Sequence, residues 1–172
     1  MRKWIYILPI LAVSMSSCRK EDVIPVSGTV TIDNTTRLGQ TYYVYGFLFS
    51  QAKLVSTLSK PRPDITVDSD GTNIFFQADN LHDSFRKAGE YSDAVAATAA
   101  FDTLTAKGSS VFLGLASPLI ANQLWIYRSG SDCYAKIRVI STISEERDGH
   151  TYAECKFEWA FQPDGSLTFP GK

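Results

Sequence analysis

The sequence is poor in several kinds of residue, and each shortage excludes a class of protein. Of its 172 residues only three are Cys, two are His and two are Met, and 17 Lys+Arg against 18 Asp+Glu give a net charge of −1. A nucleic-acid-binding domain normally carries an excess of positive charge, so this class is excluded. The few Cys and His leave little material for a zinc or iron–sulfur site.

The signatures of common enzymes are missing as well. The chain contains no G-x-S-x-G nucleophile elbow, no phosphate-binding P-loop, no H-E-x-x-H zinc motif and no G-x-G-x-x-G dinucleotide loop. An α/β-hydrolase or a Rossmann-type enzyme is therefore not expected. An aromatic fraction of 12% and a charged fraction of 20% argue against a disordered chain, and the length fits one domain. These features predict a folded, non-enzymatic protein.

The N-terminus, in contrast, carries the pattern of a secretion signal. Arg2 and Lys3 precede the apolar run Trp4–Val13, and small residues then lead to Cys18. The run is far shorter than the roughly 20 residues that a transmembrane helix needs. The order of positive charge, apolar run and small residues predicts a signal peptide over residues 1–17 that is removed.

Residues 15–18 (MSSC) resemble a bacterial lipobox, and residues 19–22 (RKED) resemble the signal with which Bacteroidota place lipoproteins on the cell surface. The resemblance implies a lipid on Cys18, a flexible tether over residues 18–27, and an outer-membrane location facing the cell exterior. Removing 17 of the 172 residues would leave 155, with 15 Lys+Arg, 18 Asp+Glu and no Met. Because this mildly acidic chain has no polybasic patch, it would attach to the membrane through lipid alone.

Residues 28–172 are predicted to form a single mainly β domain, an antiparallel sheet or sandwich with one or two short helices. Runs of alternating, β-branched or aromatic residues between turn residues indicate the strands. They are expected over 28–33, 40–50, 65–67, 73–77, 123–128, 133–143, 151–161 and 166–169. The strands 133–143 and 151–161 each alternate between a hydrophobic and a polar face, and Arg138 and Glu158 are placed to pair across them.

Two helices are expected to interrupt the strands. Asn80 is a suitable N-cap for a helix over 81–88, which Gly89 would end. Ser92 is a suitable N-cap for a second helix over 93–104. The second helix places four apolar residues on one face at helical spacing: Ala94, Ala97, Phe101 and Leu104.

The two cysteines beyond Cys18 are predicted to be free thiols. In a hairpin of 133–143 with 151–161, opposed residues have numbers that sum to about 295, whereas Cys133 and Cys155 sum to 288. They would therefore lie roughly 23 Å apart, far beyond the 7 Å or so between Cα atoms that a disulfide permits. No His or Asn stands at a recognised spacing to make either a nucleophile, so both are expected to pack as small hydrophobic residues.

His82 and His150 are the remaining strong transition-metal ligands. The plainer interpretation is two solvent-facing histidines; the sharper one is that they converge on haem iron or on a metal ion. The mature chain has no Met for His/Met ligation and no C-x-x-C-H motif for covalent haem. Three acidic residues near Gly71 loosely suggest calcium, but they lack the EF-hand spacing and are interpreted as turn residues: Asp64, Asp68 and Asp70.

Several strand and turn patterns in the last third resemble one known family. LWIYR at 124–128, YAKIRV at 134–139, DGH at 148–150 and KFEW at 156–159 together resemble the end of the HmuY-like haem-binding lipoproteins of Bacteroidota. The resemblance covers about a quarter to a third of the chain. It implies a β-rich, lipid-anchored protein that passes haem to an outer-membrane receptor. The iron ligands of that family lie in a region that does not align, so none is carried over.

The leading expectation is a non-enzymatic cell-surface protein that binds a small molecule, or assists its uptake, beside an outer-membrane receptor. The first alternative is haem capture through His82, His150 or both, and the second is a structural or adhesive surface subunit. Most aromatic residues are expected in the core. An exposed minority could stack on a sugar or a porphyrin ring.

Overall fold

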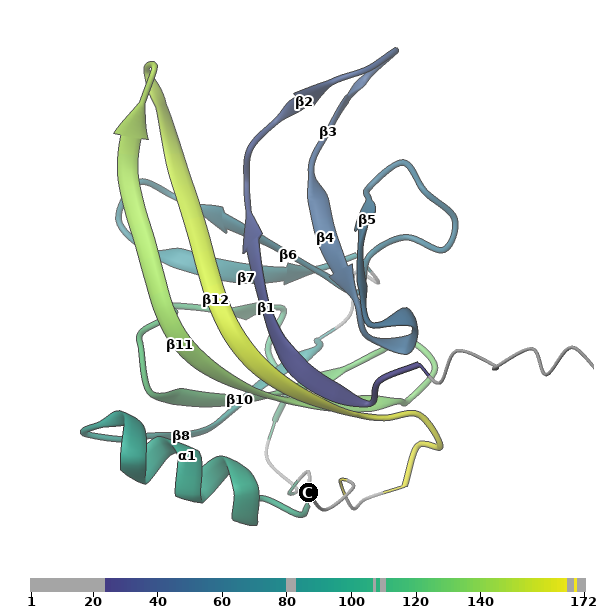
Figure 1. The fold of residues 1–172 in the computed structure, drawn as a ribbon, viewed down its shortest axis with the longest axis vertical. Helices are drawn as coiled ribbons and strands as arrows, with labels where there is room; N and C mark the ends of the chain where they lie inside the picture. The colour runs from purple at the N-terminus through teal and green to yellow at the C-terminus, as the bar shows by residue number, and fades with distance from the viewer. Residues whose placement is uncertain (1–23, 80–82, 107, 109–110, 167–168, 170–172) are drawn as a thin grey trace, which may run out of the picture.

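The structure is a computed structural model and describes residues 24–79, 83–106, 108, 111–166 and 169 (Figure 1). Two five-stranded antiparallel sheets dominate it, so the mainly β fold class is confirmed. The first sheet has the order β1-β12-β11-β10-β8, with β1 Ser27–Asp33, β12 His150–Gln162, β11 Tyr134–Arg147, β10 Gln123–Arg128 and β8 Phe85–Glu90. The second has the order β5-β4-β6-β7-β9, with β5 Lys53–Ser56, β4 Tyr45–Leu48, β6 Ile65–Ser69, β7 Ile74–Ala78 and β9 Leu115–Ala116.

Three smaller elements complete the fold. The strands β2 (Arg37–Leu38) and β3 (Tyr42–Tyr43) pair with each other and form a protruding ribbon, called the arm below. The helix α1 (Ala94–Thr103) lies beneath the first sheet in Figure 1, and the 3-10 turn η1 (Phe49–Gln51) links β4 to β5. None of the helices within the described ranges is long and apolar enough to cross a membrane.

The main core lies between the two sheets. Side chains alternate along a strand, so one face of each sheet supplies the buried residues. Phe47 of β4 lies 5.1 Å from Trp159 of β12 between ring centroids, and Phe76 of β7 lies 5.2 Å from Phe157. These aromatic contacts join strands that are distant in sequence. They also place these rings in the core, as expected for most aromatic residues. The result is a sandwich whose interior is filled by large rings.

The alternation predicts that the outer face of the first sheet is exposed to solvent, but part of this face is buried. The helix α1 covers part of it, with Ala97 and Phe101 buried against Leu124 and Ala160. The N-cap is Asp93, whose carboxylate accepts the Ala96 N–H at 2.8 Å, and not Ser92. The predicted helix over 93–104 is otherwise confirmed, although Ala94 is exposed.

The predicted helix over 81–88 is wrong. Residues 80–82 lie outside the described residues, and Phe85–Glu90 form the strand β8, which pairs with β10. Phe85 is fully buried in the core between the sheets, and Ala88 contacts the α1 side. Pairing with β10 therefore determines the strand conformation of this segment, because tertiary contacts override its weak local preference for a helix.

The long strand predicted over 40–50 is interrupted. After β4 the chain turns through η1, and Ala52 adopts a left-handed conformation with φ of 50° before β5 returns beside β4. The turn contains neither Gly nor Pro, so no local signal marked it. The strand expected over 166–169 falls partly outside the described residues, and Ser166 and Phe169 themselves are not in a strand.

The β11–β12 hairpin follows the predicted pairing closely. Arg138 stands opposite Glu158, and an Arg138 Nη2 atom lies 2.8 Å from the Glu158 carboxylate, as predicted. A register shift between Val139 and Ser141 offsets the outer half of the hairpin. Beyond this shift the hairpin extends as a projecting tip that ends in the Asp148-Gly149 turn (Figure 1).

Candidate functional site

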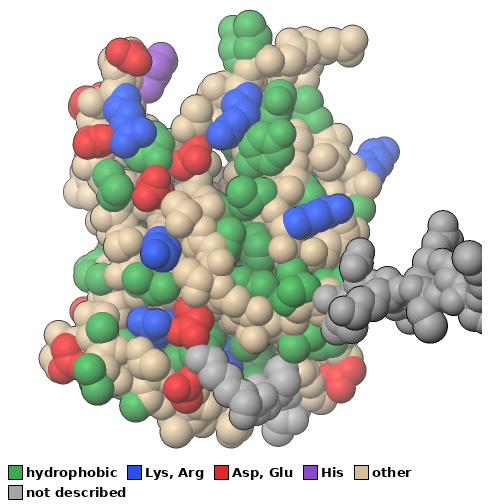
Figure 2. Space-filling model, viewed as in Figure 1, with side chains coloured by type: hydrophobic (Ala, Val, Ile, Leu, Met, Phe, Trp, Pro, Cys, Tyr) green, Lys and Arg blue, Asp and Glu red, His purple; other side chains and the backbone are tan. Residues whose placement is uncertain are grey.

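A cleft of about 1100 Å³ opens between the arm and the tip of the β11–β12 hairpin. Figure 2 shows this hollow at the top of the view, between a projection that bears acidic, basic and His side chains and another that bears hydrophobic, neutral and basic ones. Residues from β6, β7 and the segments that follow β1 and β5 also line it. Its volume slightly exceeds the roughly 300–1,000 Å³ that small-molecule sites occupy.

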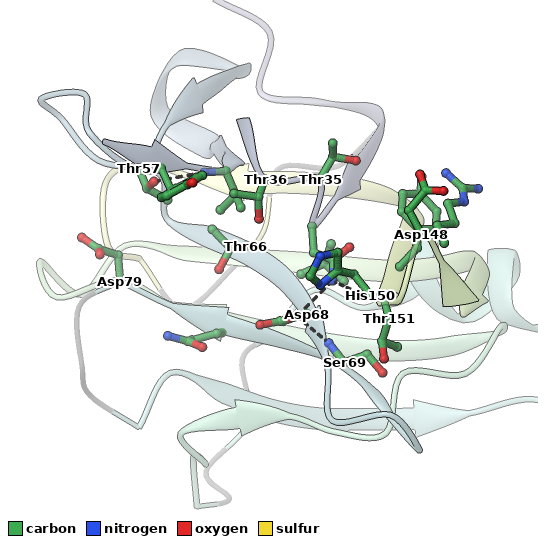
Figure 3. A pocket seen from close by; sticks show the side chains of 17 residues that line it. Thr35, Thr36, Thr57, Thr66, Asp68, Ser69, Asp79, Asp148, His150 and Thr151 are labelled. Carbon is green, nitrogen blue, oxygen red and sulfur yellow. Dashed lines mark hydrogen bonds between the residues drawn. The ribbon is translucent and has the colours of Figure 1, made fainter. Parts of the chain in front are cut away.

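The floor of the cleft is the polar face of the β6–β7 pair. Ile65 and Val67 of β6 point into the core, so the intervening Thr66 and the following Asp68 point away from it. Gln77 of β7 stands opposite Thr66 in the register and shares this face. Figure 3 shows Thr66 and Asp68 below Thr36, with Asp79 at the far end.

Asn34 joins the floor to the hairpin. Its Nδ2 atom donates to Asp68 at 3.1 Å and to the Thr151 carbonyl at 3.0 Å, and its Oδ1 atom accepts the Ala153 N–H at 2.8 Å. One side chain thus connects the end of β1 to β12 in the first sheet and to β6 in the second. This connection closes the inner end of the cleft and fixes the hairpin relative to the floor.

The hairpin wall carries a stacked pair. The Arg147 guanidinium lies 3.3 Å from the centroid of the Tyr152 ring and donates to Glu145 through Nε at 2.6 Å. Burial, followed by the hydrogen bond that its hydroxyl donates to Glu154, raises the pKa of Tyr152 to about 12. The hydrogen bond to Glu145 raises the pKa of Arg147. This wall therefore holds one guanidinium that is already engaged and a neutral phenol.

The arm supplies the opposite wall. Tyr42 lines the cleft and its side chain is 74% exposed, while Thr36 lies at the base of the arm. Leu38, the cross-strand neighbour of Tyr42, is 77% exposed but does not line the cleft. The arm thus presents one aromatic ring to the cleft.

The lining combines neutral polar groups with a small excess of negative charge. Asp68, Asp79 and Asp148 stand against a single guanidinium, that of Arg147. Asp79 is paired with Arg62, 3.3 Å away, and Asp68 accepts the Ser69 N–H and the Asn34 amide. In the part of the chain that the structure describes, the side chains of seven polar lining residues make no hydrogen bond. They include three neutral groups on the floor and at the base of the arm, and the full set is Thr35, Thr36, Tyr42, Thr66, Gln77, Asp148 and His150.

Two of the residues singled out from the sequence lie outside the described residues: Cys18 and His82. His150 is described, and it is exposed at the first position of β12 on the margin of the cleft (Figure 3). The solvent-facing interpretation of His150 is confirmed, and its convergence with His82 stays a prediction. Within the described ranges, no group of three or more His, Cys, Asp or Glu side chains is arranged to hold a metal ion.

The cysteines are free, as predicted. Cys155 is buried and stands opposite Thr142, whereas Cys133 is half-buried with its Sγ atom 3.2 Å from the Pro163 carbonyl. Burial raises the pKa of the Cys155 thiol. Neither lines the cleft.

The three acidic residues near Gly71 have separate roles. Asp70 accepts the Thr72 and Asn73 N–H groups at 2.9 and 2.7 Å, so its predicted turn role is confirmed. Asp68 belongs to the floor of the cleft. Asp64 is not a turn residue: its carboxylate accepts the Phe49 N–H at 2.8 Å and the Tyr127 hydroxyl at 3.1 Å inside the fold.

Sequence reasoning missed most of the cleft. Its threonines, Gln77 and Asn34 belong to no motif, and three-dimensional pairing alone brings them together. The one usable signal is the alternation within β6 and β7, in which Thr66 and Gln77 stand next to core-facing residues and so point away from the core. In comparisons with known proteins, no family model and no curated protein matches the chain.

Proposed function

We propose that this protein is a non-enzymatic lipoprotein of the outer cell surface that binds a small molecule in the cleft and passes it to an outer-membrane uptake receptor. The observation that carries the proposal is the cleft itself. It is walled by two protruding ribbons, and its floor presents polar side chains that make no hydrogen bond to any other described residue. Convergent polar groups in a concave site are the usual mark of a binding site.

The chemistry of the lining favours binding over catalysis. Among the described residues, the His150 side chain makes no hydrogen bond to a hydroxyl or carboxylate that it could activate. Nucleophilic or acid–base catalysis normally needs such a pair within hydrogen-bond reach. The location is supported by the signal pattern of residues 1–17 and by the lipobox that ends at Cys18.

Binding can be tested by filling the cleft. Thr36 is exposed and its side chain makes no hydrogen bond to the described residues, so a Thr36→Trp variant should fold normally while its ring occupies the cleft. Thr31→Trp is the matched control, because Thr31 is an exposed residue of β1 that does not line the cleft. Calorimetric titration of the unlipidated Cys18→Ser protein would use haemin, an array of oligosaccharides and a basic octapeptide. We expect one probe class to bind the parent and the Thr31 variant but not the Thr36 variant. Binding that survives Thr36→Trp, or no binding by any probe, would contradict the proposal.

Haem capture is the alternative that haemin itself tests. A sharp Soret band that weakens in His150→Ala or His82→Ala would establish it, since histidine is the expected iron ligand. A structural or adhesive subunit would instead form large assemblies after the lipid is removed. Gel filtration distinguishes this case, because a binding protein should elute as a small, discrete species.

The location has its own test. Cys18→Ala should move the protein from the membrane fraction to the soluble fraction, because attachment is expected through lipid alone. Proteinase K added to intact cells should degrade the lipidated parent. Protection of the parent, or membrane retention of the variant, would overturn the proposed location.

A further inference from the structure

Three properties of the cleft narrow the class of ligand. The first is the kind of hydrogen-bonding group that is left free. The hydroxyls of Thr36 and Thr66 both donate and accept, and so does the Gln77 amide. A ligand that uses the full hydrogen-bonding capacity of all three must itself carry groups that donate and accept at close spacing. Sugar hydroxyls have this property, whereas a carboxylate or phosphate can only accept.

The second property is charge. The lining holds three carboxylates and one guanidinium, and that guanidinium already contacts Glu145 and the Tyr152 ring. An anionic ligand would therefore meet net repulsion without a free positive partner. This disfavours uronic acids, sulfated sugars and the propionates of haem. A cationic ligand would find two of the three carboxylates already engaged, because Asp79 is paired with Arg62 and Asp68 accepts two N–H groups. Among the described residues of the lining, only Asp148 at the hairpin turn is left to attract it, so a basic peptide is the rival that must be tested.

The third property is an exposed aromatic ring. Tyr42 is 74% exposed on the arm and lines the cleft, although the fold gains little from it there. An aromatic face offers a flat apolar surface to the C–H face of a sugar ring. Tyr152 on the opposite wall cannot serve equally well, because Arg147 covers one face of its ring.

We propose that the ligand of the cleft is a neutral oligosaccharide that stacks on Tyr42 and hydrogen-bonds to Thr66, Gln77 and Thr36. This inference rests on the proposed binding function and adds the ligand class to it. A cleft of about 1100 Å³ suits several linked sugar units better than one. A basic peptide is the rival occupant that the test below must exclude.

The experiment uses the unlipidated Cys18→Ser protein on an array of neutral, uronic-acid and sulfated glycans, followed by calorimetry with the best neutral oligosaccharide. Tyr42→Ala should weaken binding about tenfold, while Tyr42→Phe should keep most of the affinity. Leu38→Ala is the matched control, since Leu38 is equally exposed on the same ribbon but lies outside the cleft; its affinity should stay within about twofold.

The hydrogen bonds are tested separately. Thr66→Val keeps the shape of the side chain and removes the hydroxyl, so it should weaken binding about fivefold. Binding restricted to charged glycans, or to no glycan, overturns the inference. If haemin or the basic octapeptide binds instead, and Thr36→Trp abolishes that binding, the saccharide inference is overturned and the proposed function stands. Oligosaccharide binding that Thr36→Trp leaves intact would overturn both.

Discussion

Lys136 shows how a single charged residue can belong to the core. Its side chain is 2% exposed, and Nζ donates to the carbonyls of Phe101 at 2.7 Å and Leu104 at 3.1 Å. These carbonyls lie at the C-terminal end of α1, where a helix leaves acceptors unpaired and favours positive charge. The ammonium also lies 4.7 Å from the Phe101 ring centroid. A residue that alternation placed on a solvated face therefore fastens the helix to the sheet.

Replacing this lysine should be costly. Lys136→Met keeps the length of the side chain but leaves two helix carbonyls without their donor, so we expect a loss of about 1–3 kcal/mol in the free energy of unfolding. Urea denaturation would measure it. Lys156→Met is the control, because Lys156 is exposed on β12, and it should change stability very little. Equal effects of the two variants would show that the contacts to α1 contribute nothing.

The two cysteines should differ in reactivity. Cys155 is fully buried and its thiol pKa is raised, so little thiolate is present and no reagent can reach it. Cys133 is half-buried near the surface turn. In the Cys18→Ser protein, Ellman's reagent should label Cys133 at least about tenfold faster than Cys155, and both equally after unfolding. Similar rates in the folded protein would contradict the burial of Cys155.

At the scale of elements, α1 depends on its buried face. Phe101→Ala should cost about 3–5 kcal/mol, because it removes a fully buried ring between α1 and the first sheet. Val95→Ala provides the control on the same helix, since Val95 is 81% exposed. Thermal unfolding followed by circular dichroism would compare the two. A small loss for Phe101→Ala would mean that the helix is not docked as described.

The same scale shows what the sequence could predict. Alternation located β1, β11 and β12, and helical spacing located α1, because each pattern matches a face that is in fact buried. The strand β10 was located by its run of β-branched and aromatic residues, and it is buried on both faces. The η1 turn was missed because it contains neither Gly nor Pro. The strand β8 was missed because its sequence FRKAGE has no hydrophobic alternation, and because Asn80 before it and Gly89 within it suit the two ends of a helix.

The cleft was less predictable than the strands. Its walls come from the arm, the hairpin tip and the β6–β7 face, which meet only when the two sheets pack. His150 was singled out from the sequence and does lie on its margin, but Asn34 and Gln77 drew no notice. A single polar residue in a turn or strand is common, and only its neighbours in space show that it lines a binding cleft.

At the scale of the whole molecule, Asp64 ties the two sheets together. It accepts the Phe49 N–H from the second sheet's turn and the Tyr127 hydroxyl from β10 of the first. Burial raises the pKa of Asp64 despite these hydrogen bonds. The folded protein therefore binds the Asp64 carboxyl proton more tightly than the unfolded chain does. The contribution of Asp64 to the free energy of unfolding is fully present below the unfolded pKa of about 3.9, and it is lost as the pH rises through the folded pKa.

Asp64→Asn should therefore become more favourable, relative to the parent, as pH increases. We expect the stability of the variant minus that of the parent to rise between pH 3 and pH 7. Asp70→Asn should show the opposite trend, because backbone hydrogen bonds from Asn73 and Thr72 lower the pKa of Asp70, and its contribution is lost as pH falls through the folded pKa. Urea titrations at several pH values would measure both. Parallel pH profiles for the two variants would refute this account.

The course of β1 places the N-terminal end of the domain and the cleft at opposite ends of one strand. The strand begins at Ser27 and finishes at Asp33 beside the cleft (Figure 1). Its seven residues span about 20 Å. If Cys18 carries the proposed lipid, the tether would join the domain at the Ser27 end. The arm and the hairpin tip would then be the parts of the domain farthest from the attachment point, and the attachment would leave the mouth of the cleft open to dissolved ligands.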